Sequence, residues 1–71
     1  MDQHYYVNNN STLNPGNHHE VHTEIHANQL GIVSKEYVGY FSNEVDAVAK
    51  AKYIYADADG CKTCCPRAHK G

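Results

Sequence analysis

The chain has 71 residues, with six lysines and arginines against eight aspartates and glutamates, and a formal net charge of −2. This length allows one small domain, and folds below roughly 70–80 residues usually need a disulfide, a metal ion or a partner to supplement a small core. The weakly acidic charge argues against a general nucleic-acid-binding protein, because phosphate neutralisation requires a basic face. No apolar run approaches the ~20 residues of a membrane-spanning helix, so we expect no membrane association.

The amino-terminal segment has a composition that disfavours folding. Residues 8–17 are rich in asparagine and turn formers, carry no charge and include a single aliphatic side chain. Such a segment buries too little surface to offset its ordering entropy. We therefore expect a disordered arm at residues 1–17, whose only docking points are Tyr5, Tyr6 and Val7, and a small folded domain at residues 18–71.

The next segment, residues 20–26, alternates polar and β-branched side chains. If it is a strand, Val21 and Ile25 point to one side and His22 and His26 to the other. Its β-branched content favours this interpretation. A helix stays open, because histidines four residues apart also share a helical face.

A connection is expected over residues 27–36, followed by a short strand over residues 37–41. The helix prediction is about residues 43–55, with Ser42 or Asn43 as the cap. If Asn43 is the cap, Asp46 lies three residues later in a capping-box arrangement. The expected apolar face of this helix consists of Val45, Val48 and Ala49, with the stem of Lys52 at its edge. The fold class predicted is α+β, with two or three short antiparallel strands, this one helix and a carboxyl-terminal knuckle.

The three cysteines of the chain lie together in that knuckle, where Cys61 and Cys64 form a CxxC pair and Cys65 follows directly. An odd number of cysteines cannot pair completely within one chain. Residues 1–6 lack the basic and apolar regions of a secretory signal, so we expect a cytoplasmic, reducing environment. Clustered cysteines there more often bind metal than form disulfides.

Two ligand sets are compatible with a tetrahedral zinc ion, which accepts cysteine sulfur and histidine nitrogen. The preferred set is His22, His26, Cys61 and Cys64, because it ties the first part of the domain to its last turn. The competing set is local and consists of Cys61, Cys64, Cys65 and His69; it requires two adjacent cysteines to share one ion. Unmetallated thiols in a flexible tail are the third possibility.

Catalytic interpretations are weaker. Thiol exchange of the thioredoxin type uses a helix amino terminus to lower the pKa of the first thiol, whereas Cys61 follows a turn. His19 and His22 are one residue too close for the HExxH zinc-protease motif. A catalytic zinc also needs an open coordination position and a pocket. We therefore expect no enzyme activity.

The chain resembles a known family over about 45 residues, namely the amino-terminal zinc domain of Ada-type DNA alkylation-repair proteins and related zinc modules appended to bacterial nucleases. The likeness is carried by His22-x3-His26, by residues 38–42 and 46–47, and by the knuckle at residues 60–66. It implies His22, His26, Cys61 and Cys64 as the metal positions. The family's first pair is C-x3-C or H-x3-C, whereas both positions here are histidine.

This departure bears on function. In the repair domain one of those cysteines is the zinc-bound thiolate that accepts a methyl group from DNA. Imidazoles in its place leave a less electron-rich site, and Arg67 is the only arginine in the chain. The resemblance therefore implies the scaffold without methyl transfer.

The leading prediction is a monomeric binding or interaction module with a structural Zn²⁺, whose partner is a protein or a nucleic acid. Weak nucleic-acid binding through phosphate contacts of Lys62, Arg67 and Lys70 is one alternative. The other is a thiol- or metal-handling role centred on Cys65, with His69 as an additional ligand.

Overall fold

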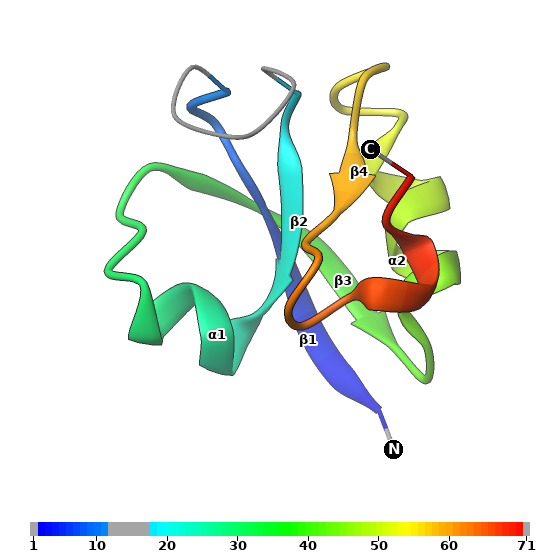
Figure 1. Cartoon of the computed structure of the whole chain (residues 1–71), viewed down its shortest axis with the longest axis horizontal. Helices are drawn as coiled ribbons and strands as arrows, with labels where there is room; N and C mark the ends of the chain where they lie inside the picture. The colour runs from blue at the N-terminus through cyan, green and yellow to red at the C-terminus, as the bar shows by residue number, and fades with distance from the viewer. Residues whose placement is uncertain (1, 12–17, 71) are drawn as a thin grey trace.

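A four-stranded mixed sheet organises the computed structural model, which describes residues 2–11 and 18–70 (Figure 1). The strands lie in the order β3-β1-β2-β4. The elements in chain order are β1 (Gln3–Asn8), β2 (Glu20–Thr23), α1 (Glu24–Gln29), β3 (Lys35–Phe41), α2 (Glu44–Ala51), β4 (Asp59–Gly60) and the short 3-10 helix η2 (Pro66–Ala68). Strands, two α-helices and a cysteine-rich end confirm the predicted α+β class.

The sheet is larger than predicted and is not purely antiparallel. β1 pairs antiparallel with β2 and with β3, whereas β2 and β4 are parallel, with Glu20 opposite Asp59 and Val21 opposite Gly60. A parallel pair needs a crossover connection, and here the chain between β2 and β4 runs through α1, β3 and α2. This crossover places β4, and the knuckle that follows it, beside β2.

The prediction of a disordered arm is wrong for residues 3–8, which form the inner strand β1. Tyr5 and Val7 are buried at 3% and 0% exposure, while His4 in the same strand is exposed. Strand neighbours on both sides satisfy the backbone of this segment, which its composition alone does not reveal. The part of the predicted arm at residues 12–17 lies outside the described residues.

The strand predicted over residues 20–26 ends at Thr23, where α1 begins. The Thr23 hydroxyl accepts a hydrogen bond from the His26 backbone N–H at 3.2 Å, which caps the helix. Gly31 ends it with a positive φ of 69°. The backbone N–H groups of Gly31 and Ile32 donate to Asn28 and Ala27, which is the Schellman arrangement.

α2 is capped by Asn43, one of the two predicted caps, whose side chain accepts a hydrogen bond from the Asp46 backbone N–H at 2.9 Å. It is shorter than the predicted 43–55 and ends at Ala51. Its buried residues are Ala47, Val48 and Ala51. Within the described ranges, no helix is long and apolar enough to cross a membrane.

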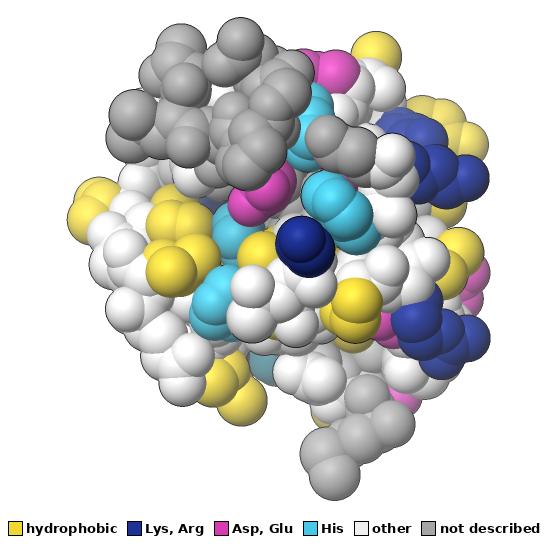
Figure 2. All heavy atoms as spheres, in the orientation of Figure 1, with side chains coloured by type: hydrophobic (Ala, Val, Ile, Leu, Met, Phe, Trp, Pro, Cys, Tyr) yellow, Lys and Arg dark blue, Asp and Glu magenta, His cyan; other side chains and the backbone are white. Residues whose placement is uncertain are grey.

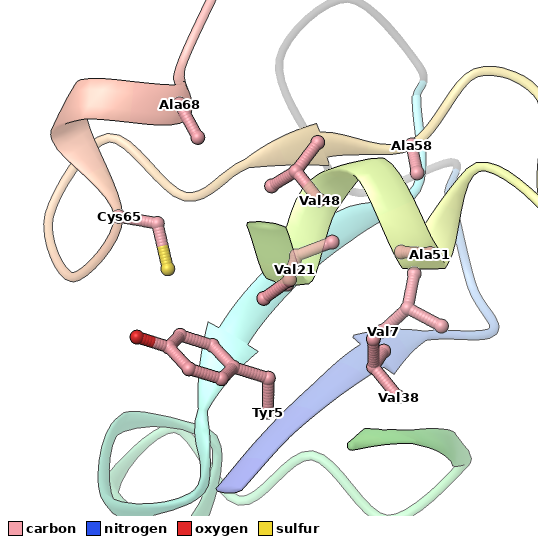
Figure 3. Packing of buried hydrophobic residues seen from close by; sticks show 10 residues of the cluster. Tyr5, Val7, Val21, Val38, Val48, Ala51, Ala58, Cys65 and Ala68 are labelled. Carbon is pink, nitrogen blue, oxygen red and sulfur yellow. The ribbon is translucent and has the colours of Figure 1, made fainter. Parts of the chain in front are cut away.

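The core lies between the sheet and α2. Side chains from β1, β2, β3 and α2 meet there, and Ala68 of η2 joins them (Figure 3). Cys65 is also part of this cluster, with 0% exposure and its sulfur directed toward Tyr5 and Val21. The third cysteine therefore packs as a small apolar side chain.

Candidate metal centre

Four side chains from two distant parts of the sequence lie close together in the structure. One donor atom from each of His22, His26, Cys61 and Cys64 lies within 4.8 Å of the others. This group could hold a metal ion, and a search of the described residues finds no other such group. His22 and Cys61 are buried, whereas His26 and Cys64 are partly exposed. The donors of the preferred predicted set are thus brought together.

The strand-to-helix junction places the two histidines. His22 is near the end of β2, and His26 occupies the first turn of α1, with the Thr23 cap between them. A continuous strand would separate residues four apart by about 13 Å. The turn into α1 instead brings the two imidazole ring centroids to 5.5 Å. The helix cap at Thr23 is therefore part of the geometry of the site.

The knuckle places the two cysteines. The Cys61 backbone N–H donates to the Val21 carbonyl at 3.0 Å, which anchors the knuckle to β2. The Cys65 N–H then donates to the Cys61 carbonyl at 2.8 Å and closes the turn. Gly60 permits this close approach, because a Cβ there would lie 2.7 Å from the Cys65 carbonyl oxygen. The turn leaves both CxxC sulfurs on the side of the histidines.

Two of the donor distances within the group are those of tetrahedral coordination. Neighbouring donors around a tetrahedral zinc lie about 3.3–3.8 Å apart, given bonds of about 2.3 Å to sulfur and 2.0–2.1 Å to nitrogen. Here Cys61 Sγ lies 3.7 Å from His26 Nδ1, and Cys64 Sγ lies 3.8 Å from His22 Nδ1. The Nδ1 atoms therefore face the sulfurs in both histidines.

Cys64 is arranged to carry a thiolate. A hydrogen bond from the Cys65 thiol, whose sulfur lies 3.8 Å away, is the main cause that lowers the pKa of Cys64, and His22 and His26 contribute in the same direction. The pKa of Cys65 is raised, because its thiol gives that hydrogen bond and is buried. Of the two adjacent thiols, Cys64 is therefore the one that ionises more readily.

Two opposing effects act on the pKa of the Cys61 thiol. Burial raises the pKa of its thiol, whereas hydrogen bonds from the backbone N–H groups of Cys64 and Thr63 oppose the rise. A buried thiol of this kind gains most from a cation, because metal coordination removes the proton and compensates the charge. The N–H groups of the knuckle are already directed at the sulfur.

Glu20 lies behind His22 and was not singled out from the sequence. Its Oε1 is 3.5 Å from His22 Nε2, and both side chains are largely buried. The Nε2 atom makes no hydrogen bond of good geometry within the described residues. A carboxylate on the far ring nitrogen favours the tautomer that leaves Nδ1 free to bind a metal. Its position two residues before His22 in a strand, hence on the same face, was the available signal.

The remaining predicted residues lie elsewhere. His69 Nδ1 is 2.9 Å from the Gly60 carbonyl oxygen and 3.4 Å from Asp59 Oδ2, so the structure does not bring it to the metal group. Cys65 faces the core next to Cys64. The local set of Cys61, Cys64, Cys65 and His69 is therefore not assembled. The three predicted phosphate contacts, Lys62, Arg67 and Lys70, are all exposed. Arg67 and Lys70 line a pocket beside α2, and Lys62 does not line it.

A scan against models of protein families finds no match, and neither does a search of curated proteins or of solved structures. The resemblance to the Ada-type zinc domain therefore stays a prediction. What the chain itself shows is a small α+β fold in which a His2Cys2 group could hold a metal ion.

Proposed function

We propose that this protein is a zinc-stabilised binding module without catalytic activity. The observation that carries the proposal is the convergence of His22, His26, Cys61 and Cys64 within 4.8 Å. A metal held by these four would connect the β2–α1 junction to the knuckle. In a domain of this size such a connection has a large effect on stability, since structural zinc contributes about 10–16 kcal/mol of apparent binding free energy in zinc-finger peptides.

Zinc is the favoured ion because of the donor types. Two thiolates and two imidazoles in a tetrahedral arrangement are typical of structural zinc sites. Hard cations such as Mg²⁺ and Ca²⁺ prefer oxygen ligands, which this group does not offer. Iron–sulfur clusters are usually held by four cysteines, and here Cys65 is directed into the core.

A structural role is favoured over a catalytic one because the protein supplies all four donors. Catalytic zinc sites keep one position for water or substrate. The two described pockets are lined by other residues, one by residues of β1, α1 and β3 and the other by residues of α2 and the carboxyl-terminal segment. Neither contains a member of the His2Cys2 group. We therefore propose that the metal stabilises the fold and that surfaces of this fold bind a partner.

The alternative centred on Cys65 has little support. A reactive thiol is accessible and has a lowered pKa. Cys65 has 0% exposure and a raised pKa. Its observed environment suits a hydrogen-bond donor to Cys64 and a core side chain.

The test is metal analysis of the full chain purified without a polyhistidine tag. We expect one zinc per chain and loss of the dispersed NMR spectrum of the folded protein after chelation, with recovery when zinc is returned. Substitution by Co²⁺ should produce the thiolate-to-metal absorption and the visible bands of a tetrahedral site. A chain that purifies without stoichiometric metal and keeps its spectrum in chelator would overturn the proposal.

A further inference from the structure

A second feature of the molecule is a groove of about 300 Å³ between α2 and the carboxyl-terminal segment. Its volume lies at the lower end of the range of about 300–1,000 Å³ for ligand pockets. The aliphatic part of its lining comes from Val45, Val48, Ala49 and Ala68. The groove is separate from the His2Cys2 group, since none of those four residues lines it.

The aliphatic lining arises because α2 has more apolar surface than the core covers. The buried residues of α2 are Ala47, Val48 and Ala51. The predicted apolar face at Val45 and Ala49 is instead exposed, and Val45 keeps 47% of its surface accessible. This part of the helix is available to a side chain of another molecule.

Three cations surround this lining, namely Lys52, Arg67 and Lys70. They are half of the six lysines and arginines of an overall acidic chain. Within residues 2–11 and 18–70, none of the three side chains takes part in an ion pair, since the pairs found involve histidines. Figure 2 shows Lys and Arg side chains in two places on the right side of the view, the side on which Figure 1 draws α2.

The one acidic residue in the lining, Asp59, is already engaged. Its carboxylate accepts hydrogen bonds from the Lys70 backbone N–H at 2.9 and 3.1 Å. The same carboxylate lies 3.3 Å from His18 Nε2 and 3.4 Å from His69 Nδ1. Asp59 is also 9% exposed. It holds the tail in place and leaves the three cations to an external anion.

We propose that this groove binds an acidic peptide segment of a partner protein, with one aliphatic side chain against Val45 and Ala49 and flanking carboxylates near Lys52, Arg67 and Lys70. The inference deepens the binding function proposed above by naming the surface and the chemistry of its partner. Arginine and lysine at the rim supply electrostatic complementarity. The aliphatic contact gives the peptide a buried anchor.

A nucleic-acid strand fits the groove less well. Single strands are held by aromatic side chains on which the bases stack, and none of the groove-lining residues is aromatic. Lys62, the third cation of the predicted phosphate-binding tail, does not line the groove. Aliphatic and cationic groups together suit a peptide that carries both an apolar and several acidic side chains.

The probe is the synthetic peptide acetyl-Glu-Glu-Leu-Glu-Glu-amide, added to zinc-loaded, ¹⁵N-labelled full chain and followed by NMR. We expect the amide shifts to change at residues 45–52 and 66–70. Replacing leucine by serine in the peptide, or each glutamate by glutamine, should weaken binding about tenfold or more. The Lys52→Gln/Arg67→Gln variant should do the same.

The matched control is Lys50→Gln/Lys62→Gln, which removes two exposed cations outside the groove and should leave the affinity within about twofold. No shift changes at millimolar peptide would overturn the proposal. Equal weakening by both double variants would also overturn it, since only net charge would then matter. Tighter binding of a single-stranded oligothymidylate through the same residues would overturn the peptide proposal and assign the groove to nucleic acid. Zinc content and the folded spectrum are measured for every sample. Loss of peptide binding in a zinc-loaded, folded protein then counts against the groove alone, whereas absence of zinc counts against the metal centre.

Discussion

Cys64 Sγ lies 3.8 Å from His22 Nδ1, although 42 residues separate the two in the chain. A metal at this point would close a loop that contains α1, β3, α2 and β4. Closing a long loop removes much conformational entropy from the unfolded chain. The contact therefore links metal binding to the stability of most of the domain.

The first prediction concerns the identity of the ligands. Cys64→Ala or His26→Ala should abolish stoichiometric zinc and the folded NMR spectrum, because each removes a donor and exposes the others to water. Cys65→Ala and His69→Ala are the controls, and both should retain one zinc per chain. Mass spectrometry under native conditions makes the measurement. Metal loss in both controls with retention in His26→Ala would instead support the local ligand set.

The second prediction concerns Glu20. Glu20→Gln should keep one zinc per chain but lower its affinity by about 10–100-fold, as is typical when a partner of a metal-bound histidine is lost. Competition against a zinc-binding dye measures the affinity. Glu36→Gln, an exposed carboxylate on β3, provides the control. An unchanged affinity in Glu20→Gln would show that the contact with His22 has no role in metal binding.

The third prediction concerns acid. Zinc binds neutral imidazole and thiolate, so binding releases protons and its apparent affinity falls as the pH falls. Zinc release and unfolding should therefore occur together as the solution is acidified. A pH titration of the circular dichroism signal, with zinc release followed by dye, checks this. Coincident midpoints for unfolding and zinc release are expected; unfolding that precedes zinc release would contradict it.

The fourth prediction concerns β1. Val7 has 0% exposure, and Val7→Ala should lower the free energy of unfolding by about 1.5–3 kcal/mol through lost burial and the cavity left behind. The matched control is Val33→Ala, since Val33 is 90% exposed and should change stability by less than about 0.5 kcal/mol. Urea denaturation of the zinc-loaded protein measures both. Equal effects would mean that β1 contributes nothing to the core.

Local chemistry explains which features were predictable. The CxxC pair and the H-x3-H pair are recognisable because metal ligation requires those side chains at short spacings. The Asn43 cap was also predictable, since a cap depends on residues three apart, and the structure confirms its hydrogen bond to Asp46. The α+β class followed from the same short-range patterns.

Features that depend on distant neighbours were not predictable in this way. Residues 3–8 read as part of a disordered arm, yet they form β1, because strands from two later segments pair with them on both sides. The exposure of Val45 and Ala49 depends on how α2 is rotated against the sheet. Amphipathic periodicity indicates an apolar face but does not determine which of its residues the core covers.

For this protein, the sequence alone determined the donor atoms: two imidazoles, two CxxC sulfurs and a third thiol whose role stayed open. Only the tertiary structure decided which of them meet. It turned the chain at Thr23 to bring His26 beside His22, placed Glu20 behind that ring and directed Cys65 into the core. The reason is physical: residue identity sets what an atom can bind, whereas convergence depends on pairing and packing across the whole chain.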